Sequence, residues 1–297
     1  MAQENTQDSV ATSPSPLASP VVSPSPEASP NPEAIPSLMA SPSPVVESQD
    51  ADKIFSKTRN TQKIAELRLL YRDQIEVYRK SDKAFNIAKT HYFNVLTLVS
   101  LEELVAANQK AMDDRLNVMI TYLDLIGTTL EDTSGVEIKL KTESLSQINE
   151  MIVNLKLHKD KVAVSRDRAL LNETADEFAL MVKPYEYVSY RALSLIRIGQ
   201  MQLVYDAAFI IDADIKKIKE SEDVGAVVKS KRARAFQEIQ RNFTITNEGL
   251  AELNDKIIFG VQESFGSSFY EKTLDGLQPI YIQMSKSLDH LTELLKL

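Results

Sequence analysis

The chain has 297 residues, of which 43% are hydrophobic, and it contains no cysteine. This length suffices for one large domain or two modest ones, and the lack of cysteine excludes disulfides, thiolate metal sites and cysteine nucleophiles. The formal net charge is -8, but the first 50 residues hold six acidic and no basic residues, so the rest is nearly neutral. A nearly neutral chain offers no general electrostatic attraction for nucleic acid, and we expect no such partner.

Residues 1–52 form a low-complexity segment with ten of the 12 prolines and eight Ser-Pro dipeptides. Proline lacks a backbone donor and disfavours helix in the residue before it, so the composition predicts a disordered, extended tether. A helical domain is expected to follow at 53–297. We interpret the tether as a spacer; in a eukaryotic cytosol its Ser-Pro dipeptides would instead suit proline-directed phosphorylation.

The beginning of the chain also bears on its location. Met1-Ala2-Gln3-Glu4 followed by a Pro/Ser-rich segment is typical of an exported chain whose signal peptide has been removed. We therefore predict an extracytoplasmic location, and a cytoplasmic one stays open as the alternative. No run in the sequence approaches the roughly 18 apolar residues that crossing a bilayer requires.

The first helix is expected at about 58–99, since only Pro184 and Pro279 interrupt the chain beyond residue 52. Apolar residues recur there three and four positions apart, the spacing that keeps one helix face against a partner helix. Only Gln74 and Ser81 break this row. Its members are Ile64, Leu67, Tyr71, Gln74, Tyr78, Ser81, Phe85, Ala88, Tyr92, Val95 and Val99.

The second helix is expected to begin at Ser100, because Ser100 and Glu103 match a capping box; alternatively, the first helix simply continues. The turn-forming run 132–135 ends it. A third helix follows Ser134 and reaches somewhere between residues 169 and 183. Pro184 is expected to break or kink the chain there, because its ring clashes with the preceding helical turn.

The fourth helix is expected from Tyr185 to about Glu220. It is apolar over a wide arc, which indicates burial by more than one neighbour and makes it the candidate central helix. After a turn at 221–225, a fifth helix runs to about Ser264. A sixth helix carries a row of Leu274, Leu277, Tyr281, Met284, Leu288, Leu291 and Leu295. If this last row is left over after intrachain packing, it would associate with another chain.

These elements predict an all-α fold, an elongated antiparallel bundle of five to six long helices with coiled-coil-like packing. We expect no enzyme, because no nucleotide-binding, hydrolase or metal-binding motif occurs, and we assign no catalytic, cofactor or metal residues. His91, His158 and His290 are expected at the surface or its rim. Asp206 and Asp212 are either buried with partners or mark an exposed side of the fourth helix.

Two clusters are candidate contact patches. The basic residues converge at the tip of the hairpin of the fourth and fifth helices, where they suit an anionic lipid, a wall polymer or an acidic protein, or are simply solvated. The tyrosines that follow Pro184 either bind a partner or pack in the core. The basic residues are Lys216, Lys217, Lys219, Lys229, Lys231, Arg232 and Arg234, and the tyrosines are Tyr185, Tyr187 and Tyr190.

Together, the tether and the helical rows indicate a non-enzymatic, exported helical bundle. It would act as a structural, scaffold or partner-binding module at a cell envelope or surface, with a protein partner or self-association. The alternative is a module that associates with a membrane surface through the basic tip near residues 216–234. Peripheral contact with a membrane or a cell-wall polymer fits either reading.

Overall fold

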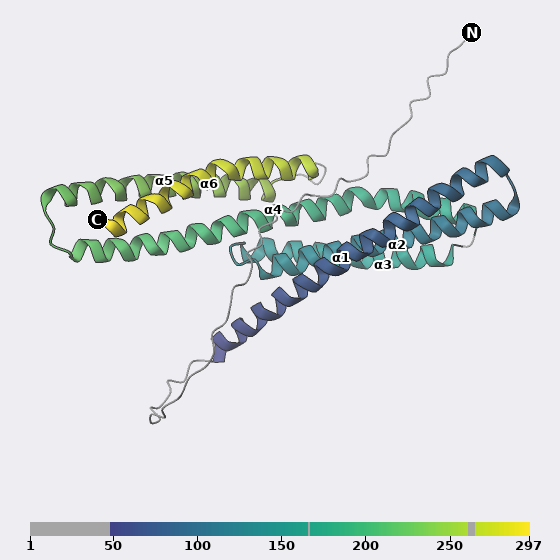
Figure 1. Ribbon diagram of the computed structural model, residues 1–297, viewed down its shortest axis with the longest axis horizontal. Coiled ribbons are helices and arrows are strands. Elements are labelled where there is room, and N and C mark those ends of the chain that lie inside the picture. The colour runs from purple at the N-terminus through teal and green to yellow at the C-terminus, as the bar shows by residue number, and fades with distance from the viewer. Residues whose placement is uncertain (1–47, 166, 261–264) are drawn as a thin grey trace, which may run out of the picture. The chain divides into compact units, whose positions relative to one another are not determined.

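The computed structural model describes residues 48–165, 167–260 and 265–297, and in these ranges the chain is all-α, with six helices and no strand (Figure 1). The predicted fold class is thus confirmed. The predicted tether lies outside the described residues up to residue 47, while residues 48–52 already belong to the first helix. The helices are α1 (Ser48–Val95), α2 (Leu98–Asp132), α3 (Ile138–Val164), α4 (Arg168–Ser221), α5 (Ala226–Ile258) and α6 (Ser267–Lys296).

Helices α1 and α2 form a hairpin in which the predicted row of α1 faces α2. Ile64, Tyr71 and Tyr78 are half-buried, whereas the opposite face of α1 is exposed. The rings of Tyr71 and Tyr122 of α2 lie 5.3 Å apart. The row ends at Tyr92, because α1 stops at Val95 and leaves that residue exposed.

The turn between α1 and α2 differs from the prediction. Leu96 adopts a positive φ of 53°, and the N-cap of α2 is Thr97 rather than Ser100. Ser100 is the third residue of the helix; its amide donates to Thr97 Oγ1 over 3.2 Å, and its hydroxyl accepts from the Thr97 amide over 3.1 Å. This reciprocal pair satisfies two donors at the helix start, and it replaces the expected pair of Ser100 and Glu103.

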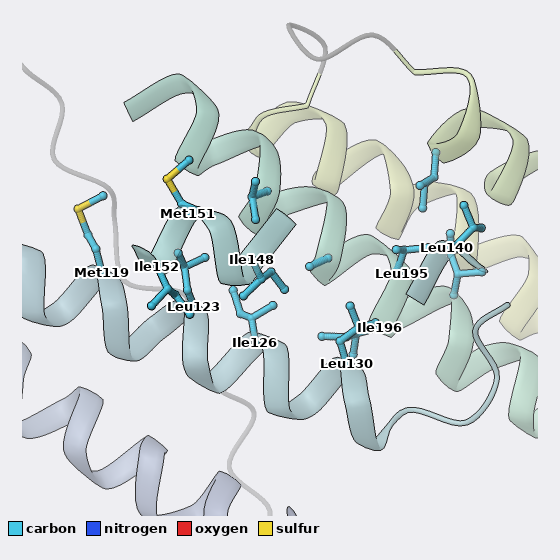
Figure 2. Close-up of a cluster of buried hydrophobic side chains, with 14 of the residues drawn as sticks. Met119, Leu123, Ile126, Leu130, Leu140, Ile148, Met151, Ile152, Leu195 and Ile196 are labelled. Atoms are coloured by element: carbon cyan, nitrogen blue, oxygen red, sulfur yellow. The ribbon is translucent and has the colours of Figure 1, made fainter. Parts of the chain in front are cut away.

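Helices α2 and α3 and the first half of α4 enclose the larger core. Figure 2 shows how side chains from these helices converge, among them Leu123 and Leu130 of α2, Ile148 of α3 and Leu195 of α4. The predicted end of α2 is confirmed at Asp132. The turn that follows lies directly on α4, since a Cβ atom added to Gly135 would stand 2.0 Å from the carbonyl oxygen of Gly199.

Of the break or kink predicted at Pro184, the break is wrong. Helix α3 ends at Val164, and α4 begins at Arg168 and continues through Pro184. The N-cap is Asp167, whose Oδ1 accepts from the Leu170 amide over 2.9 Å. Buried Phe178 and Val188 anchor α4 on both sides of the proline, and this packing offsets the lost backbone hydrogen bond.

Helix α4 contacts α2, α3, α5 and α6, so the expectation of a central helix is confirmed. Its second half joins α5 and α6 in a three-helix set around a smaller core (Figure 1). Successive helices run antiparallel, and α4 and α6 therefore run parallel. Ser194 Oγ and Thr273 Oγ1 lie 3.5 Å apart, and Arg232 bonds the carbonyl oxygens of both Lys219 and Leu297.

Candidate functional site: an exposed apolar face of α4 and α6

The structure divides the predicted row of helix α6 between a buried side and an exposed side, since Leu277, Met284 and Leu291 of that row are buried. Leu277, Ile280, Met284, Leu291 and Leu294 form the buried row. The other four members of the predicted row, Leu274, Tyr281, Leu288 and Leu295, lie seven residues apart and are exposed, Tyr281 by 64% and Leu295 by 63%. We call the α6 row the exposed residues Leu274, Gln278, Tyr281, Ser285, Leu288, Thr292 and Leu295.

The second half of α4 repeats this arrangement. Ala208, Asp212 and Ile215 are buried against α5 and α6, but Ile210 and Ile218 on the outer side are exposed. Burial by more than one neighbour holds for this half too, since residues of both α5 and α6 pack on it, but part of its apolar arc is exposed. We call the α4 row the exposed residues Arg197, Gln200, Val204, Ala207, Ile211, Asp214 and Ile218.

A groove of about 480 Å³ separates the two rows. Its floor is apolar, because Met201, Leu277 and Met284 line it, and Tyr281 and Leu288 form one rim. The two rows and the groove are called the α4/α6 face below. Side chains of this kind, spaced three and four apart on parallel helices, suit the burial of a further helix.

Some basic residues of the tip form contacts within the chain, which the sequence did not indicate. Arg232 is buried and forms an ion pair with Glu222, which also accepts from Lys219 over 3.2 Å. The hydrogen bonds from Arg232 and Lys219 hold the pKa of Glu222 below its usual value. These two cations thus close the end of the three-helix set and do not face a partner.

The other five basic residues of the tip are exposed where α4 ends and α5 begins. Lys229 forms an ion pair with Asp223 over 3.3 Å, and exposed Glu220 lies within the same turn region. The surface of the tip therefore mixes both signs of charge. The remaining exposed cations are Lys216, Lys217, Lys231 and Arg234.

The three tyrosines after Pro184 are half-buried and serve as packing groups. The ring of Tyr187 lies edge-on to Phe265 at 5.1 Å, and Tyr190 lies 6.2 Å from Tyr270. Burial strongly raises the pKa of Tyr185. Of the two interpretations, the structure favours core packing over an open aromatic patch.

Buried polar side chains are a second feature of the interior. Asp212 is buried, and its Oδ2 accepts from Gln240 over 2.8 Å, whereas Asp206 is exposed. Burial raises the pKa of Asp212. Asp212 is thus buried with a partner, and Asp206 marks an exposed side of the helix.

His158 corrects the expectation of surface histidines, because it is only 3% exposed. Its Nδ1 lies 3.5 Å from a Glu177 carboxylate oxygen, and its ring lies 5.9 Å from Phe178. Its position could have indicated this, since it stands three residues after Leu155 and four before Val162 on the buried side of α3. His91 is exposed and His290 half-buried, as expected.

Within the described ranges, no set of three or more His, Asp or Glu side chains is arranged to hold a metal ion. None of the helices described combines the length and apolar composition needed to cross a bilayer. In comparisons with known proteins, no family model matches the chain, and neither a curated protein nor a solved structure matches it significantly.

Proposed function

We propose that the helical domain is a non-enzymatic scaffold that binds a protein partner through the α4/α6 face. The observation that carries this proposal is the pair of exposed rows with an apolar groove between them. Monomeric soluble proteins rarely leave large contiguous apolar patches in water, and such patches mark interaction sites. An amphipathic helix that lies in the groove would remove Tyr281, Leu288 and Ile211 from solvent.

The proposed place of action is a cell envelope or surface. This part rests on the Ser-Pro-rich composition of residues 1–52, which suits a spacer between an attachment point and the helical domain. Fractionation of the source cells checks it: we expect the protein in the extracytoplasmic or envelope fraction. Recovery in the cytosol alone would remove this part and leave the binding proposal in place.

A second candidate is association with a membrane surface. It is supported by the exposed cations Lys216, Lys217, Lys231 and Arg234, which can contact anionic headgroups. The neighbouring acids Glu220 and Asp223 weaken that attraction. Co-sedimentation with vesicles of phosphatidylserine and phosphatidylcholine at low salt tests it. Binding that is lost when the charges of Lys216 and Lys217 are reversed by substitution would support it.

Site-specific photo-crosslinking in the source cells tests the leading proposal. A benzophenone amino acid at position 288 lies on the α4/α6 face, and one at Gln237 lies on the exposed side of α5. We expect a discrete protein adduct from position 288 only. The adduct should disappear when Ile211→Glu is added, because a carboxylate in the interface resists desolvation. Equal adducts from both positions, or none, would contradict the proposal.

A further inference from the structure

We propose that the partner on the α4/α6 face is the same face of a second copy of the chain, antiparallel and related by a two-fold axis. This inference rests on the proposed function and names the partner. The observation behind it is the order of large, small and charged side chains along the two rows. When one copy is reversed, large side chains face smaller or polar ones, and opposite charges face each other.

Both rows have the spacing of a coiled-coil seam. Their members recur three and four residues apart, and all fourteen are exposed. In an antiparallel pair of such seams, the two kinds of seam position meet in shared layers. The partner of each residue is therefore set once a single layer has been chosen.

For the α4 row, the layer that pairs Val204 with Ala207 of the other copy sets two further layers, and Ile218 at the end of the row has no counterpart within it. Gln200 then lies opposite Ile211, and Arg197 opposite Asp214. A large side chain meets a smaller or polar one in the two inner layers, so the helices can approach closely. The outer layer joins opposite charges, and it does so twice because of the two-fold axis.

The α6 row has the same property. When Tyr281 faces Ser285 of the other copy, Leu288 faces Gln278 and Leu274 faces Thr292. Each of these three layers combines one large apolar side chain with a smaller or polar one, and Leu295 at the end of the row has no counterpart within it. The symmetry axis of this row passes between Tyr281 and Ser285.

One two-fold axis serves both rows at once. The axis of the α4 row passes between Val204 and Ala207, and that of the α6 row lies at the same height. The structure sets this level, because Ser194 contacts Thr273 and Arg232 joins the carbonyl oxygens of Lys219 and Leu297. Helix α4 would therefore lie on α4 of the other copy and α6 on its α6.

A parallel two-fold arrangement is less favourable. It would place α4 on α6 of the other copy and set Arg197 beside Leu274 and Asp214 beside Thr292. Both charges would then be desolvated without a partner, which costs free energy. It would also place large side chains opposite each other, as with Ile211 and Leu288.

The mass of the full-length chain in solution is the first test. Light scattering coupled to size-exclusion chromatography at micromolar concentration should give twice 33.3 kDa. Ile211→Glu should weaken the dimer by about 100-fold or more, since two carboxylates would be buried. The matched control Ile245→Glu, at an exposed position of α5, should leave the dimer intact.

Charge reversal tests the orientation. Arg197→Asp and Asp214→Arg should each weaken the dimer, and the double variant should restore it, because the opposed pair is rebuilt with reversed signs. Far-UV circular dichroism verifies that each variant is folded. Absence of restoration in folded variants would overturn the antiparallel pairing.

Disulfide trapping gives an independent measure of the register, because the chain has no cysteine and only the introduced thiols can react. A mixture of Leu274→Cys and Thr292→Cys chains should form a mixed disulfide on mild oxidation. Leu274→Cys alone should not, since its two copies would lie roughly 27 Å apart at 1.5 Å per residue. A mixed disulfide between Gln200→Cys and Gln278→Cys chains would instead show the parallel arrangement and overturn the proposal.

A full-length chain that stays at 33.3 kDa would also overturn the second copy as partner. The proposed function would survive that result if position 288 still formed its adduct with a different protein. The absence of both the dimer and the adduct would remove both proposals.

Discussion

The guanidinium group of Arg232 lies where the end of α4, the start of α5 and the end of α6 meet. It donates to the carbonyl oxygen of Lys219 over 3.0 Å and to that of Leu297 over 2.7 Å, and it pairs with Glu222. An arginine with five donors suits such a position better than a lysine does. The single residue thereby joins the end of α4, the start of α5 and the end of α6.

Arg232→Ala should therefore lower the free energy of unfolding by about 2–3 kcal/mol, because it leaves buried acceptors without partners. Chemical denaturation with urea measures the change. The control Arg234→Ala removes an exposed arginine two positions along the same helix and should change stability by less than about 0.5 kcal/mol. Equal effects of the two variants would contradict the role assigned to Arg232.

His158 makes stability depend on pH. Burial lowers the pKa of His158, and the nearby Glu177 opposes this only in part. The folded state therefore binds fewer protons than the unfolded state, in which the imidazole titrates at about 6.5. The stabilising effect is complete above the unfolded pKa and is lost as the pH falls below it.

Urea denaturation of the wild type between pH 7.5 and 5.5 should accordingly show a decrease in stability that His158→Leu reduces. Glu177 does not account for this window, since hydrogen bonding from Lys161 holds its pKa below the usual carboxylate value. His290→Gln, at a half-buried position, should keep the wild-type slope. An unchanged slope in His158→Leu would refute the assignment.

At the scale of elements, the turn between α2 and α3 touches α4 through two glycines. A Cβ atom on Gly199 would lie 2.4 Å from Val136 Cγ2 and 2.8 Å from Thr133 Cγ2. Glycine in a helix interior normally destabilises it relative to alanine. Here the close approach of the turn requires it, and the residue determines how near α4 comes to the preceding hairpin.

Gly199→Ala should thus reduce stability by about 1–3 kcal/mol despite the better helix propensity of alanine. Gly127→Ala in α2 is the matched control, because its added methyl would meet only the side chain of Ile148, at 3.4 Å from Cγ2 and 3.9 Å from Cδ1. That substitution should be neutral or stabilising. Thermal denaturation followed by circular dichroism compares the two, and stabilisation by Gly199→Ala would contradict the packing argument.

At the scale of the whole molecule, the described residues from 48 to 297 form one compact unit with two apolar clusters. Helix α4 contributes to both clusters, and the larger one also includes Leu250 of α5 and Ile280 of α6. The two halves of the described bundle are therefore joined by continuous packing rather than by a linker. We expect them to unfold together.

Phe243→Ala in the smaller cluster tests this. It should cost about 3–5 kcal/mol, because Phe243 is fully buried and truncation leaves a cavity. Unfolding should stay a single transition that is the same by circular dichroism and by tyrosine fluorescence at fixed protein concentration. Exposed Phe259→Ala serves as control, and a separate early transition in Phe243→Ala would show that the halves are independent.

Several features of the bundle could be predicted from local sequence. The end of α2 at Asp132, the turn after α4 and the central place of α4 follow from capping residues, glycine and apolar spacing. The start of α4 could not be predicted from Pro184, because buried neighbours on both sides keep the helix continuous. For the candidate site, the sequence predicted a single row from Leu274 to Leu295, and it did not show that this row divides into a buried and an exposed side.

By itself, then, the sequence determined that the chain is helical and which positions of each helix form apolar rows, because periodicity and proline placement are local properties. Only the tertiary structure decided which row is buried. Helices α4 and α6 each carry large apolar side chains on two neighbouring sides, and packing with α5 buries one side of each. The exposed rows of α4 and α6, with Val204 and Tyr281 on opposite sides of one groove, result from this packing.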